Sequence, residues 1–361
     1  MRILITGNLG YIGPWVTRHL RATFPDASLV GLDMGFFAHC LTNAVSLPES
    51  QLDVQYLGDV RSPPAEALAG VDAVVHLAAI SNDPMGNAYE AVTMDVNYRA
   101  SVELANLAKA AGVRSFVFAS SCSVYGSAGG GPRTEQADVN PLTAYARSKV
   151  LTEGGLGELA DENFTVTCLR FATACGMSER LRLDLVLNDF VASAISTGRI
   201  TVLSDGTPWR PLINVQDMAR AIEWGIERRQ EQGGAHLVVN TGSNEWNYQV
   251  SELASAVADV IKGTEVSINK EAPPDKRSYR VDFSLFRSLA PRHVPAKGLL
   301  ETVQDLRHGL EAMRFNSPDF RDSSFMRLRV LTTLQSHGLL TPDLVWAHKV
   351  RKGSQSIVAT A

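Results

Sequence analysis

The sequence predicts an α/β fold in which a doubly wound parallel sheet, covered by helices, is followed by a smaller C-terminal lobe. Short β-branched or aliphatic runs alternate with helix-length segments over the first half of the chain, as expected for parallel strands joined by helical crossovers. A glycine-rich turn joins the first of these strands to the first helix. Near residue 172 the alternation weakens and an arginine-rich stretch begins, so we place the start of the second lobe there.

The elements follow in order along the chain. The predicted strands are the runs RILIT, SLVGLD, VQYLGD, AVVHLA, SFVFAS and TVTCLRF. Helices are predicted from the spacing of apolar residues at 12–24, 94–111, 142–161, 216–229 and 249–262. The segment EAPPDKRSYRVDF is predicted to form a loop that leads into a short strand, and RKGSQSIVATA a loose tail.

The composition limits the classes of partner. The chain has 361 residues, 45% of them hydrophobic, and a net charge of −4 without a long run of one sign, so neither nucleic acid nor a membrane surface is expected as a partner. It has no signal-peptide pattern and no apolar stretch of about 18 residues, which favours a cytoplasmic location. The four cysteines lack the spacing of a metal site, so we expect reduced thiols and no metal.

The glycine-rich turn GNLGYIG indicates a dinucleotide site. Gly7 permits a tight turn, Gly10 lets the backbone approach a pyrophosphate, and Gly13 lets the helix pack on the strand. Such a triplet can also be a simple tight turn. However, Asp33 ends the second strand, where a carboxylate can accept both ribose hydroxyls and repel a 2′-phosphate. We therefore predict a Rossmann domain that binds NAD rather than NADP.

Two further strand ends lie at the edge where ligands bind in such sheets. They are GDV, with Asp59 and Val60, and HLAAIS, with Leu77 to Ser81. Either could equally be an ordinary transition from strand to loop.

Hydroxyl-bearing residues in SSCSVYG precede a Tyr-x-x-x-Lys pair in YARSK. Tyr145 and Lys149 share one face of a predicted helix, where the ammonium can lower the pKa of the phenol and let Tyr145 act as a base. A surface pair is the alternative. The glycine turn and the polar strand end, both earlier in the chain, favour the catalytic interpretation.

Taken together, these motifs resemble the extended short-chain dehydrogenase/reductases, specifically the NAD-dependent nucleotide-sugar epimerase and dehydratase family. The resemblance covers about residues 1–312 and rests on TGNLGYIG, GDV, HLAA, MDVNYRASVELANLAKAAGVRSFVFASSCSVYG, NPLTAYARSK, LRFATACG, DGTPWRPLINVQDMARAI and NTGSNEWNYQVSELA. It implies a catalytic trio of Ser121, Tyr145 and Lys149, with Ser123 facing a sugar.

The resemblance also implies the binding residues. Cofactor contacts fall on Gly7, Gly10, Tyr11, Ile12, Gly13, Asp33, Asp59, Val60, Leu77, Ala78, Ala79, Ser81, Asn97, Lys149 and Ala172. The residues expected to bind the nucleotide diphosphate are Asn188 and Arg210, with Arg277 or Arg280. His76 and Cys122 are assigned to structure. The implied partners are a nucleotide-sugar substrate and a second copy of the chain, which would form a homodimer through the helices at 94–111 and 142–161.

The same resemblance predicts three parts of the chain. Residues 1–171 form an NAD-binding Rossmann domain, to which 209–242 return. Residues 172–208 and 243–330 form the nucleotide-sugar lobe. Residues 331–361 form a C-terminal extension and tail.

Departures from the family pattern narrow the expected reaction. The 4,6-dehydratases carry an Asp-Glu pair where this chain has Cys122 and Ser123, so dehydration is not expected. Thr173 and Arg182 match uronic-acid 4-epimerases and favour an acidic sugar, although Arg180 and Arg182 could instead carry solvated surface charge.

The expected function is an NAD-dependent nucleotide-sugar 4-epimerase that works through a transient 4-keto sugar, with Tyr145 as base and acid. A 4-ketoreductase of nucleotide deoxysugars would use the same trio once and is the alternative. A non-catalytic dinucleotide sensor is a further possibility, but it would have no need of a poised phenol.

Overall fold

The computed structural model describes residues 1–127, 129–272 and 277–347. Part of the predicted loop EAPPDKRSYRVDF and all of the predicted tail RKGSQSIVATA lie outside the described residues.

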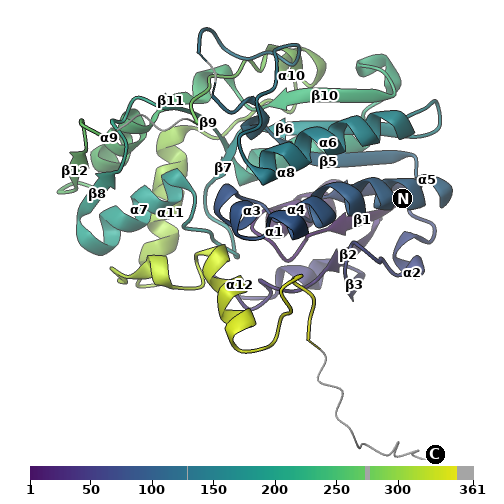
Figure 1. Ribbon diagram of the computed structural model, residues 1–361, viewed down its shortest axis with the longest axis horizontal. Helices are drawn as coiled ribbons and strands as arrows, with labels where there is room; N and C mark the ends of the chain where they lie inside the picture. The colour runs from purple at the N-terminus through teal and green to yellow at the C-terminus, as the bar shows by residue number, and fades with distance from the viewer. Residues whose placement is uncertain (128, 273–276, 348–361) are drawn as a thin grey trace, which may run out of the picture.

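The central sheet has seven strands in the order β10-β6-β5-β4-β1-β2-β3 (Figure 1). All neighbouring pairs are parallel. The strands are β1 Arg2–Thr6, β2 Ser28–Asp33, β3 Val54–Leu57, β4 Ala73–His76, β5 Ser115–Ser121, β6 Thr165–Phe171 and β10 His236–Thr241. The predicted fold class is confirmed. Because the chain runs outward from β1 to β3 and then from β4 to β10, a crevice opens at the carboxyl ends of β1 and β4.

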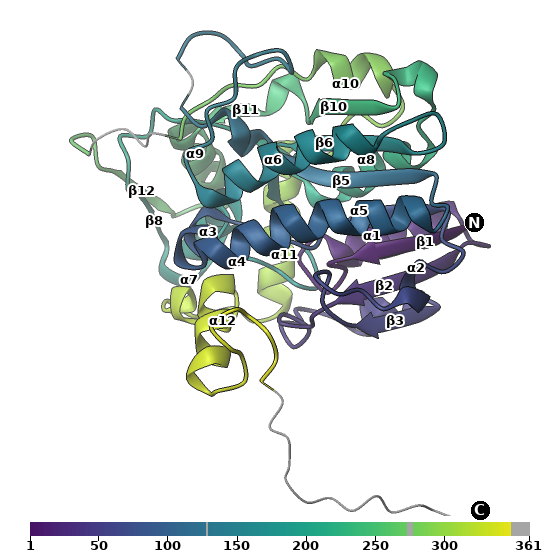
Figure 2. The ribbon, with the colours of Figure 1, turned by 45° about the vertical axis from the view of Figure 1, so that its right-hand side comes forward.

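Helices cover both faces of the sheet (Figure 2). Successive residues of a strand point to opposite faces, so Ile3 packs in the cluster that contains Leu20 of α1, whereas Leu4 packs in the cluster that contains Leu104 of α5. The long covering helices are α1 Gly13–Thr23 and α8 Val215–Glu227 on one face, and α5 Ala100–Ala110 and α6 Ala144–Leu159 on the other.

Shorter helical segments connect these elements. They are η1 Pro48–Gln51, α2 Ala65–Leu68, α3 Asp83–Ala88, α4 Glu90–Met94, η2 Asp95–Arg99, η3 Cys122–Tyr125, η4 Gln230–Gln232 and η5 Asn244–Trp246. The helix predicted at 94–111 is therefore divided, because a π-helical segment, η2, separates α4 from α5.

The second half of the chain adds two small sheets, ordered β11-β9-β7 and β12-β8. Its elements are β7 Thr173–Cys175, α7 Val186–Thr197, β8 Arg199–Val202, β9 Trp209–Asn214, β11 Asn247–Gln249, α9 Val250–Val260, β12 Glu265–Ile268, α10 Ser284–Leu289, α11 Leu299–Ala312, η6 Phe320–Asp322 and α12 Arg327–Ser336. Of the residues 209–242, α8 and β10 lie on the central sheet, whereas β9 pairs with β7 and β11.

The chain finally returns to the Rossmann domain. Helix α12 and the residues after it, yellow in Figures 1 and 2, lie beside α3. The Tyr89 hydroxyl donates a hydrogen bond to Gln335 Oε1 at 2.7 Å. Within the part of the chain that the structure describes, no helix combines the length and apolar character needed to cross a bilayer.

Candidate active site

A cavity of about 1510 Å³ lies at the carboxyl ends of the central strands, between the sheet and the second half of the chain. Most of the residues singled out from the sequence line it. They are Gly7, Gly10, Tyr11, Ile12, Asp33, Asp59, Val60, Leu77, Ala78, Ala79, Ser81, Ser121, Ser123, Tyr145, Lys149, Ala172, Thr173, Arg182, Arg210 and Arg277. Gly13, Asn97, Asn188 and Arg280 are not among the lining residues.

The glycine turn forms one wall of the cavity. Gly7 has a φ of +74°, and a Cβ added to it would lie 2.5 Å from the backbone nitrogen of Ala78. A Cβ on Gly13 would lie 1.9 Å from the carbonyl oxygen of Asn8, so Gly13 is required for packing of helix against turn rather than for lining. Any side chain at these two glycines would displace the backbone that faces the ligand.

Asp33 closes the turn from the end of β2. Its carboxylate accepts hydrogen bonds from the backbone N–H groups of Leu9, at 3.0 Å, and Gly35, at 2.7 Å. Burial raises the pKa of Asp33, and these two amides oppose that effect. A carboxylate held in this way beside a glycine turn and a helix N-terminus fits the ribose and diphosphate of NAD.

Asn97 acts from behind the cavity wall. Its side chain accepts from the N–H of Ile80 at 2.8 Å and donates to the carbonyl of Ile80 at 3.0 Å. Asn97 also donates to Ser148 Oγ at 3.2 Å, which connects the loop after β4 to α6. The structure thus gives Asn97 the position of a residue that fixes the loop lining the cofactor site.

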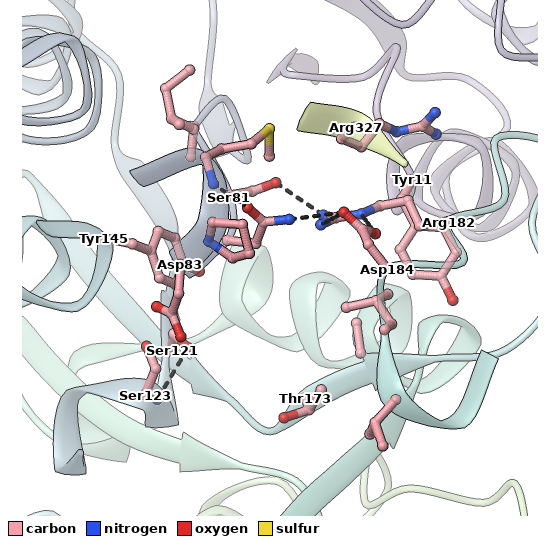
Figure 3. A pocket seen from close by; sticks show the side chains of 18 of the residues that line it. Tyr11, Ser81, Asp83, Ser121, Ser123, Tyr145, Thr173, Arg182, Asp184 and Arg327 are labelled. Carbon is pink, nitrogen blue, oxygen red and sulfur yellow. Dashed lines mark hydrogen bonds and ion pairs between the residues drawn. The ribbon is translucent and has the colours of Figure 1, made fainter. Parts of the chain in front are cut away.

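The predicted catalytic trio meets at one end of the cavity. Helix α6 begins after Thr143, whose hydroxyl accepts from the Ala146 N–H at 3.2 Å, and carries Tyr145 and Lys149 on one face. Ser121 stands at the end of β5 and lines the same cavity as Tyr145. Figure 3 shows Tyr145, Ser121 and Ser123 together on one side of the cavity.

The groups that act most strongly on the pKa of Tyr145 do not include Lys149, which the sequence predicted to lower it. Burial raises the pKa of Tyr145 to about 12, and Ser121 and the Arg182 guanidinium lower it. Lys149 Nζ lies 5.5 Å from the Tyr145 ring centre and donates to the carbonyl of Ala119 at 2.7 Å. Burial lowers the pKa of Lys149 to about 7, against the opposing charge of Glu153.

Ser123 offers an unused polar atom to the cavity. Its hydroxyl oxygen is buried and has no hydrogen-bond partner among residues 1–127, 129–272 and 277–347. Its backbone N–H donates to Ser121 Oγ at 3.1 Å. A buried hydroxyl without a partner costs free energy, so a ligand hydroxyl at this point would be stabilised.

Arg182 is buried at the opposite side of the cavity (Figure 3). It donates from Nε to Asp184 Oδ1 at 2.8 Å and from Nη2 to Asp184 Oδ2 at 3.0 Å, and its Nη1 donates to Ser81 Oγ at 3.0 Å. Arg180 is also buried and pairs with Glu49. The alternative that these two arginines carry solvated surface charge is wrong.

The residues expected to bind the diphosphate separate into two groups. Arg210 and Arg277 line the cavity, and Arg277 donates to Asp83 Oδ2 at 3.0 Å. The guanidinium of Arg280 instead lies over the Trp209 ring at 4.9 Å. Asn188 is fully buried and bonds to Gly176, Tyr11 and Arg182, so its amide supports the wall around Tyr11.

Residues 3–242 match the protein-family model described as the NAD dependent epimerase/dehydratase family. The chain belongs to this family. It is therefore an enzyme of an NAD-dependent family, and the residues of the glycine turn and Asp33 are placed to hold that cofactor.

The curated relatives of this chain include both epimerases and dehydratases. The chain is 26% identical to a UDP-glucose 4-epimerase of Neisseria meningitidis serogroup A / serotype 4A (strain DSM 15465 / Z2491), over 86% of this chain and 95% of the relative. It is 28% identical to a dTDP-glucose 4,6-dehydratase of Streptomyces griseus, over 83% of this chain and 92% of that protein.

Solved structures of similar fold include MoeE5 in complex with UDP-glucuronic acid and NAD. This structure aligns with a TM-score of 0.73 at 25% identity and covers 87% of this chain and 100% of its own. The NDP-hexosamine 5,6-dehydratase TunA has a TM-score of 0.74 at 24% identity and shares the fold.

Asp83 and Glu153 of this epimerase/dehydratase were not predicted from the sequence. Asp83 lines the cavity beside Tyr145 and accepts from the Thr143 hydroxyl at 2.7 Å, and no local pattern marked it. Glu153 follows Lys149 by four residues on α6, so the spacing that paired Tyr145 with Lys149 could have found it.

His76 and Cys122 do not line the cavity. His76 bonds to the hydroxyls of Thr6 and Ser101, each at 2.7 Å, and burial lowers its pKa to about 3. The Cys122 thiol is buried and donates to the carbonyl of Arg170 at 3.0 Å. Both contacts agree with the structural roles expected for these residues.

Proposed function

We propose that this enzyme is a nucleotide-sugar 4-epimerase that acts through a transient 4-keto sugar. The observation that supports this most is that Ser121, Tyr145 and Lys149 line one cavity together with the Ser123 hydroxyl. Bound NAD supplies the reversible oxidation of the sugar carbon. The protein must supply a base, an acid and a fixed position for the sugar oxygen.

Tyr145 moves the proton. As base, its phenolate oxygen takes the proton from the sugar hydroxyl, and as acid the phenol returns a proton to the oxygen after the sugar has turned over. Burial works against ionisation of the phenol, while Ser121 and Arg182 favour it. Ser121 also holds the sugar oxygen while negative charge develops on it, and the Ser123 hydroxyl is available to a second hydroxyl.

Lys149 has a positioning role in this proposal. Its ammonium is fixed against the carbonyl of Ala119 and lies at the inner end of the cavity, where it would donate to a cofactor ribose. Because burial brings its pKa to about 7, the lysine is charged in only part of the molecules at neutral pH. A loss of this charge would weaken the hydrogen bond that Lys149 would donate to the cofactor ribose.

The geometry at positions 122 and 123 disfavours dehydration. Elimination of water needs an acid and a base at the sugar. The Cys122 thiol is directed to the carbonyl of Arg170, away from the cavity, and burial raises its pKa well above its ordinary value. Pairing of Arg182 with Asp184 also removes the argument for an acidic sugar, because the arginine's charge is already balanced.

The test is turnover on a panel of nucleotide sugars, with the products resolved by NMR. Tyr145→Phe keeps the ring and removes the proton carrier, so turnover should fall by ~10²–10⁴-fold with NAD still bound. Ser121→Ala should lower turnover in the same direction, and Lys149→Met should also weaken NAD retention. Tyr248→Phe, on β11 and outside the cavity lining, is the matched control.

Two results would contradict the proposal. One is wild-type turnover by Tyr145→Phe on the true substrate. The other is one-way conversion of a 4-keto sugar with release of oxidised cofactor, which would assign the enzyme to the 4-ketoreductases.

A further inference from the structure

The last described residues of the chain pack against the cofactor end of the cavity. From here on, the C-terminal extension means residues 327–347, which comprise α12 and the described segment after it; it begins four residues before the extension predicted from the sequence. The family model ends at residue 242. TunA is covered over 99% of its own length yet accounts for 88% of this chain, so part of this chain has no counterpart there.

The extension is held by a buried apolar cluster. Leu331, Leu340 and Leu344 pack with Ile80 and with residues of α3 and α4. Ile80 belongs to the loop after β4, which lines the cavity. Burial of several leucine side chains stabilises this position of the extension, so it is a fixed part of the described structure.

Two contacts connect the extension to the residues that follow Asp33. Trp346 Nε1 donates to the carbonyl of Met34 at 2.6 Å, and the Trp346 ring lies 5.6 Å from the ring of Phe36. Met34 and Phe36 both line the cavity. The extension therefore supports the loop beside the carboxylate that is placed to accept ribose hydroxyls.

A second set of contacts reaches the end of β3. Arg61 donates from Nε to Asp59 Oδ2 at 2.9 Å, and from Nη1 and Nη2 to the carbonyls of Asp343 at 3.0 Å and Leu344 at 3.2 Å. One guanidinium thus joins the predicted cofactor residue Asp59 to the extension.

Leu344 itself lines the cavity and is 1% exposed. Its φ of +52° is unfavourable for a residue with a side chain. Backbone strain of this kind persists where surrounding contacts determine it, and it clusters at ligand sites. Here the strained residue lines the cavity and packs with Ile80 in the buried cluster.

Arg327 adds a positive charge to the same wall. It lines the cavity, is 1% exposed and donates to the carbonyls of Ser324 and Arg180. Among the residues that the structure describes, no carboxylate forms an ion pair with it, and burial lowers its pKa to about 10. A buried cation without a counter-ion favours an anionic ligand, and a dinucleotide diphosphate has that charge.

We propose that the C-terminal extension is part of the NAD site: it walls the adenosine end of the cavity through Leu344 and Arg327, Trp346 holds it against Met34 and Phe36, and NAD leaves only when it opens. This assignment uses the cofactor of the family and does not depend on which sugar reaction follows. The extension would thereby keep NAD bound between turnovers.

The test measures NAD retention in the full chain, without sugar. Trp346→Ala removes the hydrogen bond to Met34 and the ring contact with Phe36. Trp346→Phe keeps a ring and loses only the donor. Val345→Ala is the matched control, because Val345 is the adjacent residue and is 39% exposed. Bound NAD per chain is measured after denaturation, and its exchange rate with labelled NAD before denaturation.

We expect Trp346→Ala to exchange NAD roughly tenfold faster than the wild type, as the loss of one hydrogen bond and a ring contact implies. The exchange rate of Trp346→Phe should lie between those of the wild type and Trp346→Ala, and the rate of Val345→Ala should match the wild type. After stripping of NAD, the Trp346 variants should also gain less thermal stability from added NAD than the wild type does.

Wild-type exchange rates in both Trp346 variants would overturn the proposal, as would equal stabilisation of all variants by NAD. If Trp346→Ala does not fold, Trp346→Phe alone decides between these results. Because no sugar is present, failure here is distinguishable from failure of the 4-epimerase proposal.

Discussion

Replacing Glu153 with glutamine tests whether a buried ion pair behind the active site supports both the fold and the charge of Lys149. The side chains of Glu153 on α6 and Arg170 on β6 are 6% and 8% exposed. Arg170 donates to the carboxylate from Nε at 2.9 Å and from Nη2 at 2.7 Å, and the Ser120 hydroxyl donates to it as well. The pair therefore connects α6 to two adjacent strands.

The expected loss of stability follows from this burial. Glutamine has nearly the shape of glutamate, but it leaves the Arg170 guanidinium buried without a counter-ion; its acceptors are then one amide oxygen and the Tyr125 hydroxyl, at 3.0 Å. Removing one partner of a buried pair costs roughly 3–5 kcal/mol in the free energy of unfolding. For a chain of 361 residues we expect the melting temperature to fall by roughly 4–7 °C.

A second effect concerns Lys149. The negative charge of Glu153 raises the pKa of Lys149 against burial, which brings it to about 7. Without that charge the pKa should fall further, so less of the lysine is protonated at neutral pH. Turnover by the variant should then decline at neutral pH, because a neutral lysine is a weaker donor to the cofactor ribose.

The measurement is urea unfolding followed by circular dichroism, with Glu158→Gln, on the same helix, as control. The double variant Glu153→Leu with Arg170→Met should recover most of the lost stability, because no unpaired charge remains. The reasoning is refuted if Glu153→Gln and Glu158→Gln unfold at the same urea concentration.

Three further predictions follow from other parts of the structure. Asp33→Ala should weaken NAD binding and reduce the difference in affinity between NAD and NADP, measured by titrating each cofactor into stripped protein. Equal affinities of the wild type for NAD and NADP would contradict the assigned role of Asp33. The protein should be a dimer by light scattering at micromolar concentration and Leu151→Glu a monomer, since Leu107 on α5 and Leu151 on α6 are exposed by 38% and 43%; a monomeric wild type would disprove this. The hydrogen bond from His19 lowers the pKa of Glu223, so wild type should be more stable than Glu223→Gln above the ordinary pKa of a glutamate. This advantage should vanish as the pH falls through the lowered pKa, and a pH-independent difference in unfolding would exclude the ion pair as its source.

Local patterns in the sequence predicted the sheet, the glycine turn and the shared helix face of Tyr145 and Lys149, whereas Ser121 was assigned through the family resemblance. Alternation along a strand and a spacing of four along a helix are short-range features, so neighbours such as Ile3 and Leu4 must face opposite sides of a strand, and Tyr145 and Lys149 must share one side of a helix. The fold class followed because parallel strands need helical crossovers.

Tertiary packing decided which polar residues reach the cavity. The motif that selected Asn188 and Arg182 contains no information on their partners, and the structure buries Asn188 against Tyr11 and balances Arg182 with Asp184. The choice between Arg277 and Arg280 likewise depended on which guanidinium the backbone directs inward and which lies over Trp209.

The C-terminal extension shows most clearly that local sequence patterns do not predict long-range contacts. Its contacts join residues separated by 282 positions between Arg61 and Asp343 and by 312 between Met34 and Trp346. No periodicity within the extension encodes these pairs, because they depend on how α12 packs against α3 and on the burial of leucines that only the folded chain brings together. The sequence by itself therefore predicted the residues of the NAD site, whereas only the tertiary structure placed the end of the chain against the cavity that those residues line.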